Sequence, residues 1–584
     1  MKLLSLLKEL SLHPKNAEEL KGLILQLAVE GKLTANWRED NPNVESASEL
    51  LKQIETKKDL LIKEKKIKKS KPLDVISDDE KYFHIPETWI WERLGNVGNI
   101  FNGNSVNKAI KEAKYTGLKE GYPYIGTKDV GYGFESINDD NGVKIPHDEP
   151  KFKIANKGTV LICSEGGSAG KKMGMLPQAC CFGNKLYAIE QFGEIESVYI
   201  LGLYGSPAFS NAFQEKMSGI IGGISRSNFI DLLIPLPPIE EQKAIVELVK
   251  QLFTEVEQIE ELTKERISLK EDFVTSALRK LTESENTTQE WNFLQEHFSS
   301  FFTEKLNVKK LRETILQLAV QGKLTAKWRE ANPSVEHASE LLKRIEAEKQ
   351  QLITEKKIKK EKPLPPIEEE DKPYDLPKSW TWCRWVDLLG AVYYPMKRGP
   401  FGSSLRKADF VEKGIRVFEQ YNPINDDPDW MRYFITESKY ESMKAFTTTA
   451  GDFLISCSGA TLGRIVYLPE GTMSGIINQA LLKLTLSHEV IKPDYFLKLF
   501  RSQYIQEIIW GNAKGMAQPN MVGVKELKQI LIPLPPMEEQ ISILQKVNSL
   551  MALCDELEQQ IDNSQTQIEH LMQSCLKEVF DTCV

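Results

Sequence analysis

Histidine, cysteine and long apolar runs are scarce in this sequence, and each shortage removes a class of protein. The 584 residues include seven histidines, with no HExxH or zinc-like cluster. The eight cysteines show no CxxC spacing and are scattered as in a reducing compartment. No stretch approaches the roughly 20 apolar residues of a membrane span, and Lys8 and Glu9 interrupt the only signal-like opening. We therefore expect a cytoplasmic protein without a membrane partner.

An excess of positive charge is also missing. The formal net charge is -8 and the pI is about 5.7, which counts against affinity for DNA over the whole surface because phosphates attract Lys and Arg. Any binding to nucleic acid must depend on local clusters. The composition, 41% hydrophobic and 27% charged, is typical of globular proteins, and the length allows three or four domains.

Catalytic motifs are absent as well. GGSAGKK at 166–172 is the nearest approach to a phosphate loop, but Glu165 replaces the first glycine and Lys172 replaces the Ser or Thr. We predict an ordinary turn there. Glu64 and Lys66 resemble part of a nuclease site but lie in a charge-dense helical pattern. The sequence therefore predicts no catalytic, cofactor-binding or metal-binding residue.

What the sequence does contain is an internal repeat. ILQLAVEGKLTANWRE at 24–39 returns as ILQLAVQGKLTAKWRE at 315–330, and the likeness continues through ASELLK to KKIKK. IPLPPIEEQ at 234–242 returns as IPLPPMEEQ at 532–540. The inserts between these motifs, about 83–233 and 374–531, have diverged. After a duplication, flanks and inserts have had the same time to diverge, so duplication alone does not explain why only the inserts differ. The simplest interpretation is that the flanks bind two copies of one partner and the inserts bind different ligands.

The flanks are helical in pattern and the inserts are mixed. Apolar residues spaced by three and four over 3–30 predict helices, with a break at His13-Pro14 and a C-terminal cap at Gly31. A further helix is expected over 48–67. The basic run 57–71 fits either a solvated helix face or a contact with DNA phosphates. Short β-branched and aromatic runs with many turns predict α+β inserts, with helix around Val198–Met217.

A long helix is predicted after each IPLPP motif. One from Lys243 to Lys280 would be roughly 57 Å long at about 1.5 Å per residue. The predicted heptad positions are Ile245, Leu252, Ile259 and Phe273 with Leu248, Leu262 and Leu269, and Val547, Cys554, Ile561, Ile568 and Cys575 with Leu550, Leu557 and Leu571. We expect the two helices to pack antiparallel as a spacer. The first and last segments of the chain are expected to meet and to close a ring-like pseudo-dimer.

Three groups of polar and basic residues, in matching order, make each insert a candidate for DNA binding. Arg and Lys can contact phosphates or guanine, Asn and Gln can read adenine, and aromatic side chains can stack on bases. In the first insert they are Asn102, Asn104, Ser105 and Lys108; Ser164, Ser168, Lys171 and Lys172; and Ser225, Arg226 and Asn228. In the second they are Lys397, Arg398, Ser403, Arg406 and Lys407; Arg464; and Lys514, Gln518 and Asn520.

The combination of motifs resembles the DNA-specificity subunit of type I restriction-modification systems. The resemblance rests on the two IPLPP closings, the GKLTANWRE and GKLTAKWRE segments, the GPFGSSL loop at 399–405 and the SGATLGR turn at 458–464. It covers both halves of the chain. The first insert departs from it, with FNGNSVNKAI in place of GPFGSSL and SEGGSAGKK in place of SGATLGR.

The resemblance implies an α+β fold in which two target recognition domains are separated by two long antiparallel coiled-coil helices, with a pseudo-two-fold internal repeat. We expect an N-terminal helical segment at 1–75, recognition domain 1 at 76–236 and a central long helix at 237–281. A linker with the second helical segment at 282–372, recognition domain 2 at 373–534 and a C-terminal long helix at 535–584 follow.

The resemblance also implies a non-catalytic chain that binds double-stranded DNA. Two methyltransferase subunits using S-adenosylmethionine to methylate adenine would dock on it, and two restriction subunits using ATP and Mg would join them, so no cofactor is expected in this chain. Domains of about 150 residues have a radius of gyration near 15 Å and could reach major grooves about 34 Å apart. The alternatives are a methylation-only system, or a coiled-coil adaptor whose inserts bind proteins.

Overall fold

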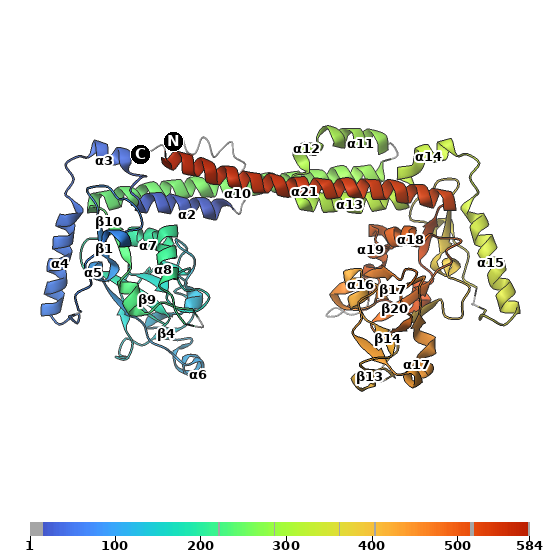
Figure 1. Cartoon of the computed structure of the whole chain (residues 1–584), viewed down its shortest axis with the longest axis horizontal. Coiled ribbons are helices and arrows are strands. Elements are labelled where there is room, and N and C mark those ends of the chain that lie inside the picture. The colour runs from blue at the N-terminus through green and yellow to red at the C-terminus, as the bar shows by residue number, and fades with distance from the viewer. Residues whose placement is uncertain are drawn as a thin grey trace. The chain divides into compact units, whose positions relative to one another are not determined.

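The computed structural model describes residues 16–69, 71–219, 222–284, 287–360, 363–401, 404–513 and 519–581. The chain divides into two compact units. Unit 1 comprises residues 1–267 with 567–584, and unit 2 comprises residues 268–566. Each unit contains helices and sheets in the same order (Figure 1), so the α+β class and the internal repeat are confirmed. Within the described ranges, no helix combines the length and the apolarity needed to cross a membrane.

Unit 1 begins with three helices and ends on a long one. They are α2 (Asn16–Val29), α3 (Ala35–Asp40), α4 (Ala47–Lys63) and α10 (Ile239–Glu283), of which residues 239–267 belong to this unit. The predicted apolar stripe of α2 is buried: Leu20 and Ile24 lie in one core cluster with Val249 and Val256 of α10. Gly31 ends α2 with φ +73°, and a Cβ there would lie 2.6 Å from Pro86, so this position requires glycine.

The insert of unit 1 forms two four-stranded sheets with strand orders β2-β9-β6-β7 and β4-β3-β8-β5. The strands are β1 (Ile90–Arg93), β2 (Gly98–Asn102), β3 (Tyr122–Ile125), β4 (Lys144–Ile145), β5 (Ile154–Ala155), β6 (Val160–Cys163), β7 (Met173–Met175), β8 (Cys180–Phe182), β9 (Leu186–Gln191) and β10 (Leu233–Leu236). The helices are α5 (Leu94–Val97), α6 (Lys108–Ile110), α7 (Ser197–Gly205), α8 (Pro207–Glu215) and α9 (Arg226–Ile230). The passage predicted to be helical around 198–217 is confirmed as α7 and α8.

Unit 2 repeats this plan. Its helices are the end of α10, α11 (Thr287–Glu296), α12 (Phe298–Phe301), α13 (Lys305–Val320), α14 (Ala326–Ala331), α15 (Ala338–Thr354), α16 (Tyr421–Asn425), α17 (Glu437–Met443), α18 (Pro493–Phe500), α19 (Gln503–Gly511), α20 (Val524–Leu527) and α21 (Met537–Asp581). Residues 537–566 of α21 belong to this unit.

The insert of unit 2 has a four-stranded sheet of order β12-β20-β17-β18 and a five-stranded sheet of order β13-β15-β14-β19-β16. The strands are β11 (Thr381–Arg384), β12 (Met396–Arg398), β13 (Phe410–Val411), β14 (Ile415–Phe418), β15 (Tyr433–Ile435), β16 (Thr447–Thr448), β17 (Asp452–Ser456), β18 (Ile465–Tyr467), β19 (Gly475–Ile477), β20 (Leu481–Thr485) and β21 (Leu531–Leu534).

The IPLPP motifs close each insert as the partner of its first strand. In unit 1, β1 pairs antiparallel with β10, with Trp91 opposite Pro235. In unit 2, β11 pairs with β21, with Trp382 opposite Pro533. Each insert therefore leaves and rejoins its scaffold through a two-stranded ribbon. Because this ribbon needs only one partner strand, the prolines can be accommodated in it.

A buried glutamate joins the repeated motifs of unit 1 to each other. Glu241, fully buried at the start of α10, accepts hydrogen bonds from the Thr34 hydroxyl at 2.7 Å and from the Arg38 guanidinium at 2.5 Å. Its second oxygen accepts from Trp89 Nε1 at 2.7 Å. The GKLTANWRE segment, the insert and the long helix thus meet on one carboxylate. We call this cluster of Thr34, Arg38, Trp89 and Glu241 the scaffold hub of unit 1.

The scaffold hub of unit 2 has the same contacts. Glu539, also fully buried, accepts from the Thr325 hydroxyl at 2.7 Å, from Arg329 at 2.5 Å and from Trp380 Nε1 at 2.8 Å. The glutamine after each glutamate repeats as well: Gln242 accepts from the Glu196 N–H, and Gln540 accepts from the Lys492 N–H. The second glutamate and the glutamine of each EEQ motif are therefore explained by internal hydrogen bonds.

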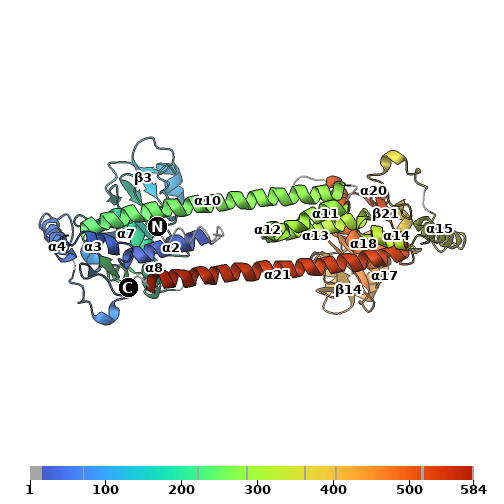
Figure 2. The same cartoon turned by 90° about the horizontal axis from the view of Figure 1, so that it is seen from above.

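A long helix follows each IPLPP motif, as predicted. α10 and α21 each have 45 residues, and α10 extends beyond the predicted Lys243–Lys280 at both ends. In unit 2 the end of α10 and the start of α21 run in opposite directions with α13 between them (Figure 2). Lys310 of α13 bonds Glu271 at 2.8 Å, and Arg312 bonds Asp555 at 2.7 Å.

The predicted heptad seam is only partly correct. Val547, Cys554 and Ile561 are buried in the core of unit 2, but Leu262 and Leu269 are 65% and 62% exposed. The reason is that the apolar faces of the long helices are covered by the short repeat helices α2 and α13 where these are present.

Two further expectations have different outcomes. The linker around 282–303, for which the sequence pattern predicted no element, contains α11 and α12, and Trp291, Phe298 and Phe301 pack on the core of unit 2. The predicted contact between the first and last segments falls largely on residues 1–15 and 582–584, which lie outside the described residues.

Candidate nucleic-acid interface

In both inserts, strand register brings the first two candidate groups to one edge of a sheet. In unit 1, Tyr187 of β9 lies opposite both Asn102 at the end of β2 and Ile162 near the end of β6. In unit 2, Leu482 of β20 lies opposite both Arg398 at the end of β12 and Ile455 near the end of β17. The loops that follow these strands therefore leave the sheet side by side.

The third group joins the second through backbone hydrogen bonds. In unit 1, Gly166 N–H donates to the Gly222 carbonyl at 2.8 Å, and Ile224 N–H donates to the Ser164 carbonyl at 3.0 Å. In unit 2, Gly459 N–H donates to Pro519 at 2.9 Å and Met521 N–H donates to Cys457 at 2.9 Å. The three predicted groups are thus neighbours in each unit, although they lie far apart in sequence.

The first loop of unit 1 combines structural and exposed residues. Asn104 Oδ1 accepts from the Lys153 N–H at 2.8 Å, so this side chain braces the loop. Gly103 precedes it where a Cβ would lie 1.9 Å from the Phe182 carbonyl oxygen. Ser105 and Lys108 are exposed, and Lys108 lies 3.9 Å from Glu112.

The second loop of unit 1 is the predicted turn and carries a cation beside an aromatic ring. It connects β6 directly to β7, and Ser164 is buried with its hydroxyl on the Lys185 carbonyl at 3.0 Å. Lys171 is exposed and Ser168 is half-buried. Lys172 Nζ lies 5.3 Å from the ring centre of Tyr132, which is 58% exposed. A cation over an exposed ring is a suitable surface for a nucleic-acid base or phosphate.

The third group of unit 1 is largely engaged in packing. Arg226 Nε donates to the Ile100 carbonyl of β2 at 2.7 Å, and Asn228 Nδ2 donates to the Lys216 carbonyl at 3.0 Å. The Ser225 hydroxyl caps α9 by accepting from the Asn228 N–H at 3.1 Å. These contacts position the loop. Arg226 is exposed and uses only Nε in its contact with Ile100, so its terminal guanidinium nitrogens are the best placed of this group to contact a ligand.

The first loop of unit 2 is more basic and more aromatic. Lys397 lies 4.9 Å from the Tyr394 ring centre. Arg398 donates to the Met521 carbonyl at 3.1 Å and lies 5.7 Å from the ring of Phe401, which is 70% exposed. Arg406 and Lys407 are exposed. Ser403 lies outside the described residues.

The same loop is tied down by a carboxylate. Asp409 accepts from the Arg406 backbone N–H at 2.6 Å and lies 3.1 Å from Lys439. The backbone hydrogen bond and the lysine lower the pKa of Asp409. The guanidinium of Arg406 thus extends from a fixed turn.

Arg464 ends the second loop of unit 2 and is exposed. Its backbone is fixed by hydrogen bonds with Thr461 at 3.2 Å and Ser456 at 2.8 Å, so an exposed side chain extends from a hydrogen-bonded turn. Asn520 is half-buried and forms a bridge with Ser458. Lys514 and Gln518 lie outside the described residues.

Several residues at this edge are missing from the sequence prediction. Gln420 Nε2 donates to the Ser456 hydroxyl at 2.9 Å and to the Ser458 carbonyl at 3.1 Å. Next to it, Tyr421 stacks on Trp430 at 4.2 Å between ring centres and is 45% exposed. Burial raises the pKa of Glu419. These residues follow β14, whose pairing partner β19 runs parallel to it.

A matching feature in unit 1 follows the parallel pair β3 and β8. A pocket of about 240 Å³ there is lined by Lys111, Lys128, Asp129 and Lys185, among other residues. A usable sequence signal exists in both units, because polar residues directly follow an apolar strand in YIGTKD and in VFEQYN. The groups predicted from the sequence centre on loops with basic, amide and hydroxyl side chains, and they omit these two strand ends.

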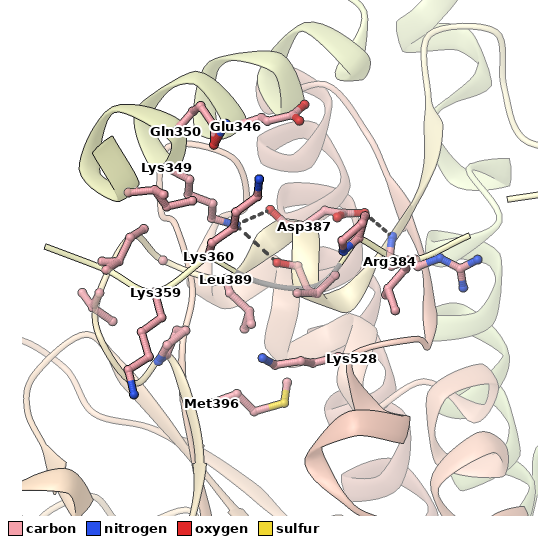
Figure 3. A pocket seen from close by; sticks show the side chains of 18 of the residues that line it. Glu346, Lys349, Gln350, Lys359, Lys360, Arg384, Asp387, Leu389, Met396 and Lys528 are labelled. Atoms are coloured by element: carbon pink, nitrogen blue, oxygen red, sulfur yellow. Dashed lines mark hydrogen bonds between the residues drawn. The ribbon is translucent and has the colours of Figure 1, made fainter. Parts of the chain in front are cut away.

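A larger cavity of about 820 Å³ lies at the other end of β12, away from the candidate loops, and Met396 and Lys528 line it. Lys349 Nζ donates to the carbonyls of Val386 and Asp387 at 3.3 and 3.1 Å (Figure 3). Burial raises the pKa of the Asp387 carboxyl, against the lowering effect of the Arg384 N–H. This cavity lies between α15 and the recognition domain, and it shares Tyr394, whose ring contacts Lys397, with the candidate interface.

Comparison with known proteins gives consistent matches over both halves. The family model described as "Type I restriction modification DNA specificity domain" matches residues 86–269 and 402–567. The chain is 32% identical to the type I restriction enzyme EcoAI specificity subunit of Escherichia coli, over 94% of this chain and 92% of that one. It is 30% identical to the EcoEI specificity subunit of Escherichia coli, over 95% and 92% of the two chains.

Among solved structures, the HsdS subunit from Thermoanaerobacter tengcongensis matches with a TM-score of 0.38 and 16% identity, covering 86% of this chain and 99% of that one. The assignment rests on the family model and on the sequence identity with the curated relatives, which extend over nearly the whole length. The chain belongs to the family of DNA specificity subunits of type I restriction-modification systems.

Proposed function

We propose that this chain chooses the DNA target of a type I restriction-modification complex by reading a bipartite, asymmetric sequence. Recognition domain 1, residues 76–236, would read one part and recognition domain 2, residues 373–534, the other. The observation that carries the proposal is that each insert brings three polar loops to one sheet edge, with the same backbone plan and different side chains.

The side chains at these edges suit DNA. Exposed Arg406, Lys407 and Arg464 in unit 2 can contact phosphates or the acceptor atoms of guanine. Lys171 and Lys172 with Tyr132 offer cations and a ring in unit 1. Since the two sets differ in type and spacing, the two parts of the target would differ in sequence, and the bases between them would go unread.

The chemistry would be supplied by partners. Two methyltransferase subunits carrying S-adenosylmethionine would dock on the two matching scaffolds, and restriction subunits requiring ATP and Mg would join them. One supporting feature is a groove of about 640 Å³ in unit 1 between Trp37 and the α10 residues Leu248 and Gln251. Trp37 and its repeat Trp328 are both half-buried, so part of each indole surface is open to a partner.

Methylation sequencing of DNA from cells carrying this chain and its methyltransferase tests the proposal directly. The expected result is an adenine mark within a gapped sequence whose two parts differ. A continuous motif, or no adenine mark, would contradict the proposal. Copurification then addresses the partners: a translocase-sized ATPase in the complex indicates restriction, and its absence indicates a methylation-only system.

The salt dependence of DNA binding separates this function from a protein adaptor. Several phosphate contacts should make affinity fall by about 10³-fold or more between 50 and 200 mM salt. Flat or undetectable DNA binding would instead favour an adaptor whose inserts bind proteins.

A further inference from the structure

We propose that the lysine turns at the ends of α4 and α15, residues 64–69 and 355–360, bind DNA phosphates outside the recognised bases. Each unit would then hold the duplex at two places, one that reads sequence and one that does not. The inference rests on the proposed DNA-binding function and adds a site to it. We call the two segments, both with the sequence EKKIKK, the lysine turns.

The internal repeat provides a control for this interpretation. Exposed residues on the bodies of α4 and α15 are retained only in part: Lys52 and Glu55 recur as Lys343 and Glu346, but Lys57 corresponds to Glu348, Leu60 to Gln351 and Lys63 to Thr354. All six residues of the lysine turns are identical between the copies, and all four lysines in each turn are exposed. Since burial does not explain the identity of exposed lysines, a shared ligand does.

Backbone geometry also indicates that the lysines are retained for their charge and not for the shape of the turn. Lys65 and Lys356 have φ of 58° and 56°, in the left-handed region that glycine adopts most easily. Lys66 N–H donates to the Leu61 carbonyl at 3.0 Å, and Lys357 N–H donates to Leu352 at 2.9 Å. A turn selected only for this geometry would favour glycine, yet both copies keep lysine.

The chemistry of the lysine turns fits phosphates. Each turn presents four lysines against one glutamate, and the only apolar residue, Ile67 or Ile358, is half-buried. Lysine is depleted from protein–protein interfaces, where aromatic residues and arginine are enriched. The ligand must also be the same in both units although the neighbouring recognition loops differ. The phosphate backbone meets this condition because it does not depend on sequence.

Each lysine turn lies beside the recognition domain of its own unit. In unit 1, α4 extends from the scaffold along that domain (Figure 1) and is joined to it by a hydrogen bond of 3.0 Å from Lys58 to Asn96. In unit 2, Lys359 Nζ lies 5.2 Å from the Tyr393 ring centre, and Lys359 and Lys360 border the large cavity next to the domain (Figure 3). DNA held by the recognition loops would thus continue past a second positive surface.

The test uses the full chain and two quadruple variants, K65Q/K66Q/K68Q/K69Q and K356Q/K357Q/K359Q/K360Q. The matched control, K52Q/K57Q/K63Q/K343Q, removes the same number of exposed lysines from the helix bodies. Binding is measured by fluorescence anisotropy between 50 and 200 mM salt, with a duplex carrying the methylated target and with an unrelated duplex. The variants K65G and K356G each remove one lysine and at the same time favour the left-handed backbone at that position. Weaker DNA binding by these variants would therefore reflect lost charge and not a misfolded turn.

Each turn variant should weaken binding about tenfold, by the same factor on both duplexes, and should reduce the slope of log affinity against log salt by about 2, as for two lost phosphate contacts. The control should bind within about twofold of the wild type, and the methylated sequence should not change. Turn variants that bind DNA as the control does would overturn the inference and leave the proposed function standing.

Two other outcomes are informative. If the turn variants bind DNA normally but lose copurifying methyltransferase, the ligand is an acidic protein surface and the DNA inference is wrong. If the wild-type chain itself binds neither duplex, the proposed function fails and the inference fails with it.

Discussion

The scaffold hubs and the recognition edges of the two units have changed at very different rates. The hubs centred on Glu241 and Glu539 use the same residue types, with donor–acceptor distances that agree within 0.1 Å. At the edges, the backbone plan persists while the side chains do not: Lys171 and Lys172 end one loop where Arg464 ends the other. Identity between the two units therefore coincides with internal contacts at the hubs, and variation coincides with the side chains of the candidate interface.

The comparison also refines the interpretation of the repeat. Identity between the flanks first suggested two copies of one partner. The structure shows that Thr34, Arg38 and Trp89 are retained because they bind a buried carboxylate of their own chain. These internal contacts do not explain identities at exposed positions, such as those in the lysine turns.

Removing a hub glutamate should have the largest effect. E241A leaves the Arg38 guanidinium and Trp89 Nε1 without their acceptor, and breaking a buried ion pair typically costs about 3–5 kcal/mol. E539A should cost the same within about 1 kcal/mol, since the hubs match. Urea denaturation of each variant measures this. The neighbouring exposed residues supply the controls E240A and E538A, and a large difference between E241A and E539A would mean that the hubs are not equivalent.

A methyl group at the base of the first recognition loop should come next. G103A and G399A would place a Cβ 1.9 and 1.8 Å from the carbonyl oxygens of Phe182 and Asn478. Overpacking of this kind costs about 1–3 kcal/mol. We expect each variant to lose recognition of one part of the methylated sequence and to keep the other. Loss of both parts from a single variant would show that the two domains do not read independently.

Single arginines should have a narrower effect. If Arg464 or Arg406 reads a base, R464A or R406A should cost about 1–3 kcal/mol and relax one position in the part read by domain 2. K171A, in domain 1, is the comparison, and it should leave the part of the target read by domain 2 unchanged. Binding to duplexes with single-base substitutions measures the effect. A uniform loss over all sequences would identify a phosphate contact instead.

The smallest expected effect concerns acid stability in unit 1. Hydrogen bonds from the Ser77 N–H and from Arg93 lower the pKa of Glu80 from 4.5 to about 2. Because the folded-state pKa is depressed, Glu80 stabilises the fold above about pH 4.5 and loses this contribution as the pH falls toward 2. The difference in thermal midpoint between the wild type and E80Q should therefore shrink over that range. A difference that does not vary with pH would contradict this assignment.

D371N provides the matched variant in unit 2, because Asp371 occupies the place of Glu80 and accepts a hydrogen bond of 3.1 Å from the Glu368 N–H, as Glu80 does from the Ser77 N–H. There, the counterpart of Arg93 is Arg384, which donates to the backbone carbonyls of Pro365, Pro366 and Gln529. These carbonyls do not titrate, so the acid sensitivity of this contact should be confined to unit 1.

The sequence predicted more of the fold than of the interface. Helix periodicity identified α2 and both long helices, and repeated motifs identified the two units. The heptad pattern was misleading at Leu262 and Leu269 because it cannot show which stretches of a long helix have a neighbour. Among the site residues, Asn104, Ser164 and Asn228 turned out to brace loops, since an amide or hydroxyl in a loop serves backbone and ligand equally well. Gln420 and Tyr421 were missed because they follow a strand and not a basic cluster.

The sequence by itself determined that one plan is used twice, since repeated motifs and apolar periodicity are local properties that can be read directly. Only the tertiary structure decided why the motifs are kept and which loops act together. Glu241 meets Thr34 across 207 positions of the chain, and strand register brings the ends of β2 and β6 to one edge. Contacts of this kind depend on how distant segments pack, which no local pattern specifies.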